Sequence, residues 1–212
     1  MAKIIWGVSG ERYFETGLDK GVFFLGTAVG VPWNGLISVS EGTGGASARP
    51  FYLDGKKILN LSSVEEFEAK VSSFFSPVGF DVCDGSYAIS PGLFATQQPR
   101  KSFSFTYRTL LGNDVDAEHH AYKIHLVYNA LAIPSDRERR TINENAEAVP
   151  LSWDVSTLPP AVTGLKPTAH FVIDSRTADA TVLSNLEDLL YGTDLQNSAM
   201  PTVAELITLF GG

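Results

Sequence analysis

Cysteine is nearly absent from this sequence, because Cys83 is the only one among 212 residues. A single thiol cannot form an intramolecular disulfide, and no cysteine and histidine spacing matches a zinc site, so we expect no disulfide, metal or other cofactor. The most apolar stretch, residues 21–33, is interrupted by glycines and Pro32 and is shorter than the roughly 20 residues of a membrane-spanning helix. The first ten residues are too weakly apolar for a signal peptide. These absences predict a protein that is made and kept in solution.

Basic residues are also in deficit, since 16 Lys and Arg stand against 24 Asp and Glu and give a formal net charge of −8. This is the wrong sign for a protein that grips nucleic acid by counterion release. The same sign would let DNA pass a surface without being held, because like charge raises the potential against phosphate. The composition therefore fits an ordinary acidic protein or a non-adhesive conduit. The one basic run contains Arg137, Arg139 and Arg140. We interpret it as a solvated loop or as a contact with a neighbouring subunit.

Strong catalytic motifs are missing as well. The sequence has no phosphate-binding glycine loop followed by lysine, no Gly-x-Ser-x-Gly and no His-Glu-x-x-His. We interpret His119 and His120 as solvated side chains of a polar hairpin loop, and His125 and His170 as hydrogen-bonded histidines of strands. We therefore expect that the protein is not an enzyme.

Alternation of apolar and polar residues dominates the middle and later parts of the chain and predicts strands. The clearest runs are residues 102–111 and 122–130, which we expect to form a hairpin across the turn at residues 112–114. Further strands are predicted at residues 151–156, 169–173, 35–40 and 56–61, the last of them after the turn pair Asp54-Gly55. Residues 64–75 fit either periodicity, and their β-rich neighbours favour a strand.

Two helices are predicted near the end of the sequence. Residues 178–191 place leucines on one stripe and stop at Gly192, and residues 203–210 follow a capping box formed by Thr202 and Glu205. The predicted fold class is therefore mainly β with C-terminal helices, in a single domain over residues 1–212.

Three stretches lack regular patterning: an N-terminal arm at residues 1–20 and loops at 42–50 and 76–100. A C-terminal extension at 195–212 carries the short helix. Loops longer than about 12–15 residues are usually functional or binding segments. We expect these stretches to mediate contacts between subunits.

A series of short sequence motifs, in a fixed order, resembles a known family. The motifs are VPWNGL (31–36), LNL (59–61), EEFEA (65–69), YRTLLGN (107–113), YKIHLVY (122–128), KPTAH (166–170) and LYGTD (190–194). None of them encodes chemistry, so their specificity lies in order and spacing. From residue 14 onward, nearly the whole chain resembles the major tail proteins of actinobacterial long-tailed bacteriophages, the siphoviruses.

The resemblance implies a tail-tube fold, in which two antiparallel sheets pack as a sandwich or distorted barrel with a flanking helix. It implies a structural virion protein that self-assembles into stacked hexameric rings around a lumen for DNA ejection. The expected partners are copies of the chain, a tape-measure protein, and tail terminator and baseplate proteins, while DNA passes without specific binding and no membrane is engaged. The expected location is the virion tail, and the host cytoplasm during assembly.

With this assignment the arm, the loops and the chain end become candidate assembly sites. Their candidate residues are Trp6, Tyr13, Phe14, Gly42, Thr43, Gly44, Phe80, Phe94, Arg137, Arg139 and Phe210. The candidate lumen residues are Glu65, Glu66 and Glu68, whichever of them face inward, because the net charge of −8 and the passage of DNA call for a negative lining. Glycosidic chemistry is disfavoured for them, because adjacent strand residues point to opposite faces and no second acidic cluster pairs with them. No catalytic, cofactor-binding or metal-binding residue is expected.

Two other functions remain open. A carbohydrate- or receptor-binding β-sandwich would carry exposed aromatic side chains on a concave face, and a hydrolase would place its chemistry on a β-scaffold. Neither predicts tubes about as wide as phage tails, so electron microscopy of the purified protein separates them from the first assignment.

Overall fold

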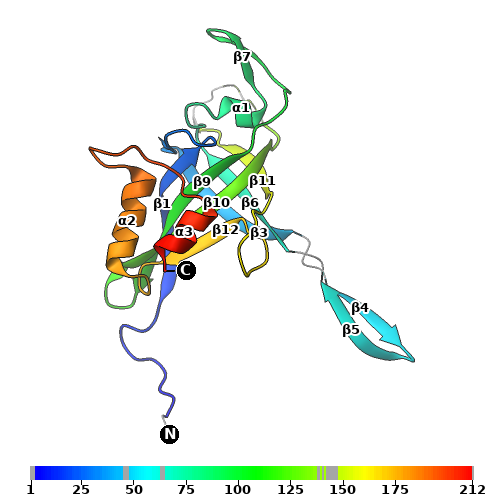
Figure 1. Ribbon diagram of the computed structural model, residues 1–212, viewed down its shortest axis with the longest axis vertical. Coiled ribbons are helices and arrows are strands. Elements are labelled where there is room, and N and C mark those ends of the chain that lie inside the picture. Colours follow the sequence, from blue (N-terminus) through cyan, green and yellow to red (C-terminus); the bar gives the residue numbers. More distant parts are fainter. Residues whose placement is uncertain are drawn as a thin grey trace. The chain divides into compact units, whose positions relative to one another are not determined.

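The computed structural model describes residues 3–44, 48–62, 65–137, 139, 141 and 148–211. The fold is mainly β with antiparallel pairing and with helices in its C-terminal part, as predicted (Figure 1). The chain divides into two compact units that interleave along the sequence. Unit 1 contains Met1–Leu36, Ser104–Val127 and His170–Gly212, and unit 2 contains Ile37–Phe103 and Tyr128–Ala169.

The sheet of unit 1 has the strand order β2-β1-β9-β10-β12. Its strands are β1 (Phe14–Phe24), β2 (Val31–Pro32), β9 (Phe103–Asn113), the first part of β10 (Ala117–Pro134) and β12 (His170–Asp174). Phe105 and Tyr107 on β9 are buried, as the alternation predicted, and so are Ile124 and Leu126 on β10. The hairpin predicted from these two runs is therefore confirmed.

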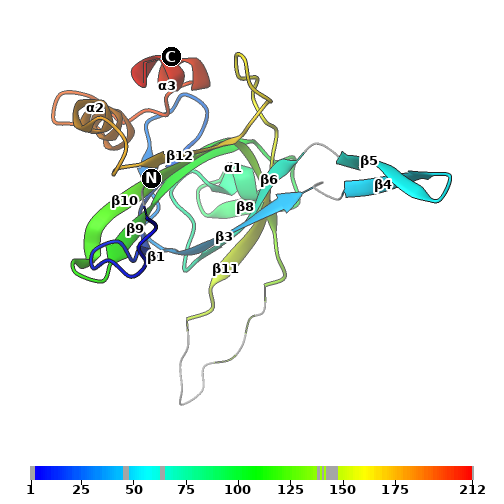
Figure 2. The same ribbon diagram turned by 90° about the horizontal axis from the view of Figure 1, so that it is seen from below.

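Both predicted helices are confirmed, and in the views of Figures 1 and 2 they lie over the same face of this sheet. Helix α2 (Ala180–Tyr191) begins at Asp179, whose carboxylate accepts from two backbone amides of the first turn, and it ends at Gly192. Its leucines at positions 183, 186 and 190 face the sheet and are buried. Helix α3 (Val203–Leu209) begins with the capping box of Thr202 and Glu205.

Strand β1 corrects the prediction that the first 20 residues form an irregular arm, because it begins at Phe14. Two register shifts against β9, between Thr16 and Leu18 and between Asp19 and Val22, break the period-two pattern along β1. The arm therefore ends near residue 13.

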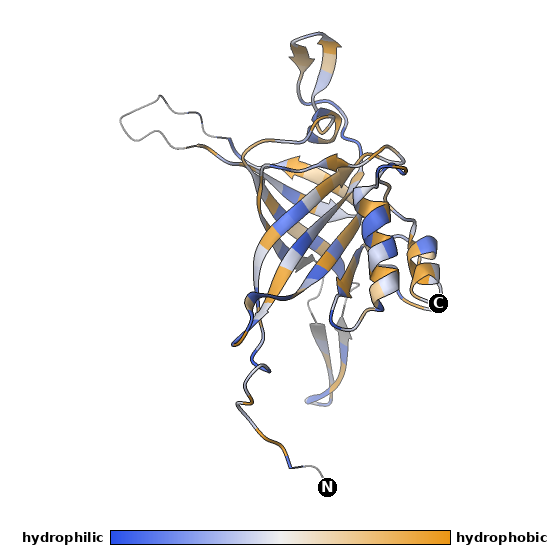
Figure 3. Ribbon diagram, turned by 90° about the vertical axis from the view of Figure 1, so that its left-hand side faces the viewer, coloured by the Kyte–Doolittle hydropathy of each residue, from blue (hydrophilic) through white to orange (hydrophobic). Residues whose placement is uncertain are grey.

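The sheet of unit 2 has the order β10-β11-β6-β3 and uses the second part of β10. The other strands are β11 (Leu151–Thr157), β6 (Glu66–Ser73) and β3 (Leu36–Gly44). Strand β6 confirms the strand interpretation of residues 64–75, since Ala69 and Val71 are buried and their neighbours point outward. The same alternation is visible along the strands in Figure 3.

Two further hairpins belong to unit 2. Strands β4 (Ala48–Leu53) and β5 (Lys56–Ser62) pair with each other through the predicted turn, where Asp54 and Gly55 both have positive φ, at 50° and 73°. This is the backbone of a type I′ turn. Strands β7 (Tyr87–Ser90) and β8 (Leu93–Ala95) follow the short helix α1 (Asp81–Asp84).

The loops predicted at residues 76–100 and 42–50 are therefore corrected. The first contains α1 and the β7–β8 hairpin, whose strands are too short to leave a clear periodic signal. The second lies in the end of β3 and the start of β4, and its residues 45–47 are outside the described residues, as are Arg140 and Val64.

Candidate assembly surfaces

The N-terminal arm of unit 1, residues 3–13, carries the most exposed aromatic side chain among the described residues. Trp6 is 83% exposed, and Ile4 and Ile5 before it are also exposed. The arm is held at its base, where the Gly10 amide donates to Asp114 Oδ1 at 2.8 Å. Large apolar side chains gathered at a chain terminus without cover are typical of an interaction segment.

Tyr13 and Phe14 are half exposed and already make contacts within unit 1. The guanidinium of Arg176 lies 4.9 Å from the centroid of the Tyr13 ring, and the His120 ring lies 5.4 Å from it. Phe14 pairs with Gly112 on β9. These two predicted assembly residues therefore form the junction between the arm and the sheet.

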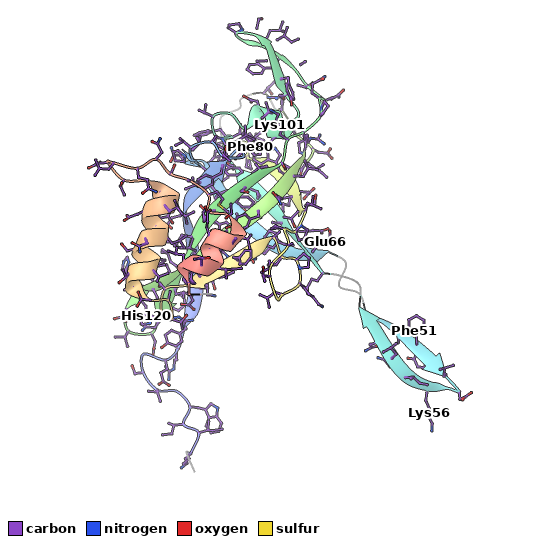
Figure 4. The ribbon with its side chains drawn as sticks, viewed as in Figure 1. Phe51, Lys56, Glu66, Phe80, Lys101 and His120 are labelled. Atoms are coloured by element: carbon purple, nitrogen blue, oxygen red, sulfur yellow. The ribbon has the colours of Figure 1, made fainter. Side chains whose placement is uncertain are left out.

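The β4–β5 hairpin exposes apolar side chains on both of its faces. Phe51, labelled in Figure 4, lies opposite Leu59 in the ladder. Tyr52 is the next residue along the strand and therefore projects from the other face, opposite Lys57. Five large apolar side chains of the hairpin are between 50% and 65% exposed: Phe51, Tyr52, Leu53, Ile58 and Leu59. An isolated two-stranded hairpin is marginally stable in water, so a surface of this kind calls for a partner.

The predicted residues Gly42, Thr43 and Gly44 lie in β3 and not in a loop. Gly44 packs against the Glu68 side chain, and a Cβ at that position would overlap it. The side chain of Thr43 lies outside the described residues. Residues 42–44 therefore do not form a loop, and that part of the prediction is wrong.

Phe94 and Phe80 were predicted together and have different environments. Phe94 on β8 is 49% exposed, beside exposed Ile89 and Leu93 on the same hairpin. Phe80 is fully buried, with its ring edge-on to Phe103 at 5.2 Å and to Trp153 at 5.1 Å. Phe80 is therefore a core residue of unit 2 and is not available to another subunit.

Arg137 is engaged within its own unit. Its Nη2 donates to both carboxylate oxygens of Asp84 at 2.9 and 2.8 Å, and its guanidinium lies 5.8 Å from the Trp153 ring centroid. The Trp153 indole N–H donates to Asp84 Oδ1 at 2.8 Å, so one carboxylate at the end of α1 joins the arginine to the core. Arg139 is exposed.

Two of the three acidic residues predicted for the lumen, Glu66 and Glu68, lie on one outward face of unit 2. Glu65 precedes β6, and Glu66, Glu68 and Lys70 share the exposed side of that strand. On β11 the neighbouring Asp154 is also exposed and pairs in register with Lys70. The outward face of β6 and β11 thus presents Glu66, Glu68 and Asp154 against a single ammonium group.

Phe210, the last predicted assembly residue, is 40% exposed and follows α3. It lines an apolar groove of about 340 Å³ between α3 and β12 in unit 1. Asp174 lies at the edge of the groove, where its Oδ2 accepts a hydrogen bond from Arg176 Nη2 at 2.6 Å. This hydrogen bond lowers the pKa of the Asp174 carboxyl below the ordinary value.

A hydrogen-bond chain crosses the four adjacent strands β1, β9, β10 and β12 of unit 1. The Thr109 hydroxyl donates to Glu15 Oε1 at 2.6 Å, so its oxygen is left to accept from His125 Nε2 at 3.1 Å. His125 Nδ1 is hydrogen-bonded to His170 Nε2, also at 3.1 Å. The histidines were predicted to be hydrogen-bonded within the sheet, and these contacts confirm it.

Sequence reasoning missed the two-sided apolar surface of the β4–β5 hairpin. The signal was present in the FYL run before Asp54-Gly55 and the IL pair after it, since an alternating strand that buries one face would not place large apolar residues next to each other. It also missed the groove, because that surface joins residues 171–178 to residues 206–210.

No family model matches the chain, and no curated protein matches it. Among the described residues, no helix is both long enough and apolar enough to cross a membrane.

Proposed function

We propose that this chain is the structural subunit of a bacteriophage tail tube, which self-assembles into stacked rings and has no catalytic role. The observation that carries the proposal is the β4–β5 hairpin with its two exposed apolar faces. A hairpin that joined only one neighbouring surface would need only one apolar face. Two apolar faces suit a hairpin enclosed between copies of the chain, as in an assembly with many repeated contacts.

The energetics of such an enclosure are favourable. The five apolar side chains of the hairpin retain about half of their exposure, and full burial of one such side chain contributes roughly 1.5–3 kcal/mol. Covering them would contribute about 4–8 kcal/mol per subunit before the ordering cost of association. Because each subunit repeats the contact, this gain adds to the other contacts between copies in offsetting the cost of association.

The distribution of charged side chains indicates which face of unit 2 would line the lumen. We propose that the outward face of β6 and β11, with Glu66, Glu68 and Asp154, lines the lumen. Carboxylates there would repel phosphate and let DNA slide through without being held. A tube whose inner wall was predominantly basic would contradict this placement.

The test is assembly of the purified protein, followed by sedimentation and by electron microscopy of negatively stained samples. We expect rings or tubes from the wild-type chain. The double variant Phe51→Ser with Leu59→Ser should remain folded by circular dichroism and lose the tubes, because both side chains are exposed in the subunit. A control is Leu165→Ser, which removes an exposed apolar side chain from a loop and should leave assembly unchanged.

A wild-type protein that stays monomeric at high concentration would refute the tail-tube proposal. If the same monomer bound immobilised glycans, the carbohydrate-binding function would replace it.

A further inference from the structure

The groove between α3 and β12 offers an apolar surface that no charged ligand would recognise. Its walls include Phe171, Ile173, Leu206, Ile207 and Phe210. The carboxylate in its lining, Asp174, is already bonded to Arg176 through both oxygens. The volume of about 340 Å³ lies at the small end of the range of ligand pockets, which suits one or two large side chains.

The same unit carries a segment of matching size and chemistry. The tip of the arm, Lys3-Ile4-Ile5-Trp6, has three exposed large apolar side chains and no secondary structure. Trp6 at 83% exposure is unusual, because tryptophan is highly buried on average. The arm leaves the sheet away from α3 in the views of Figures 1 and 3.

Charge complements this match. The tip of the arm carries one lysine and no acidic residue, whereas residues 171–212, which include the groove walls, carry six carboxylates and one cation, Arg176. The segment that forms the groove is therefore of opposite net charge to the arm tip, which favours the encounter.

We infer that the groove receives the N-terminal arm of a second copy of this chain, with Trp6 seated against Phe210 and Ile207. The inference rests on the proposed self-assembly and specifies one of its contacts. Donor and acceptor are different segments of unit 1, so a heterologous contact can repeat from copy to copy. Each copy that accepts an arm from one neighbour then still offers its own to another, which builds a closed ring or a chain of subunits, whereas a reciprocal exchange of arms would stop at a pair.

Disulfide trapping tests the contact without removing its apolar side chains. A chain with Lys3→Cys at the arm tip and Thr177→Cys at the rim of the groove should give a ladder of covalent oligomers under mild oxidation. Native Cys83 is buried and does not compete. The control chain combines Lys3→Cys with Thr163→Cys, an exposed position in unit 2, and should give at least tenfold less product.

Three results would overturn the inference. Cross-linked monomers would mean that the arm occupies the groove of its own chain, and a yield equal to that of the control pair would mean that the arm does not enter the groove. A ladder that persists when Trp6→Ala is added would mean that the tryptophan does not seat there.

Fluorescence gives a second readout on the chain with its natural cysteine. Trp33 and Trp153 are buried, so acrylamide should quench mainly Trp6 in the monomer. In the assembled state the quenching constant of Trp6 should fall severalfold, and it should return to the monomer value when Phe210→Asp blocks the groove. Tubes in which acrylamide quenches Trp6 as strongly as in the monomer would refute the arm contact and leave the tail-tube proposal standing. A ladder of cross-linked oligomers without tubes would refute the tail-tube proposal and leave the arm contact standing.

Discussion

Removal of the Phe80 ring is the sharpest test of how unit 2 is held together. Phe80 is fully buried at the start of α1 and meets Phe103 and Trp153 edge-on, at interplanar angles of 77° and 70°. Phe80→Ala removes the transfer free energy of the ring, leaves a cavity and abolishes both aromatic contacts. Substitutions of this type cost about 3–5 kcal/mol. For a chain of this size the expected fall in melting temperature is roughly 6–20 °C.

The measurement is urea unfolding followed by circular dichroism, with Phe94→Ala as the matched control. Phe94 is half exposed on β8, so its removal should change the free energy of unfolding by less than about 0.5 kcal/mol. Equal midpoints for the two variants would refute the packing argument. A Phe80→Ala chain with unchanged unfolding but impaired assembly would restore the sequence-based prediction that Phe80 is a contact residue.

The remaining predictions concern three sites. Gly112→Ala should destabilise the chain by about 1–3 kcal/mol in thermal unfolding, because its Cβ would overlap the Phe14 ring, whereas Gly42→Ala has room for a Cβ and should be nearly neutral. Burial raises the pKa of the Cys83 thiol to about 12, so a thiol reagent at pH 8 should label it only after unfolding, and prompt labelling of the native chain would contradict its burial. Burial raises the pKa of Glu15, but hydrogen bonds from Lys123 and Thr109 outweigh it and hold the pKa below 4.5. The stability that Glu15 contributes is therefore present above pH 4.5 and is lost as the pH falls through the lower folded pKa, so urea titrations at pH 5 and pH 3 should differ less for Glu15→Gln than for wild type.

Regular patterns in the sequence were sufficient where one face of an element is buried. The alternation in β9 and β6, the turn at Asp54-Gly55 and the capping box before α3 are local signals, and each was found in the structure. They depend on backbone geometry and on one neighbouring surface, which a short window of sequence records.

Other features depend on contacts between distant residues. The bulges in β1 shift its register against β9, and the strands β7 and β8 have only four and three residues, so neither shows a period. The burial of Phe80 depends on Trp153, more than seventy positions later in the chain, and the pairing of Arg137 depends on Asp84. No local pattern reports these pairs, which is why Phe80 and Arg137 were both assigned to the surface between subunits.

The interleaving of the two units has a consequence for the timing of synthesis. Every residue of unit 2 lies between positions 37 and 169, whereas unit 1 also needs the segment His170–Gly212. A growing chain can therefore complete unit 2 while unit 1 still lacks β12 and both of its helices. The apolar arm leaves the ribosome before the walls of the groove, residues 171–210, have been made. A nascent chain therefore exposes the proposed donor segment before it has the groove proposed to accept one, so two chains at early stages of synthesis could not join through that contact.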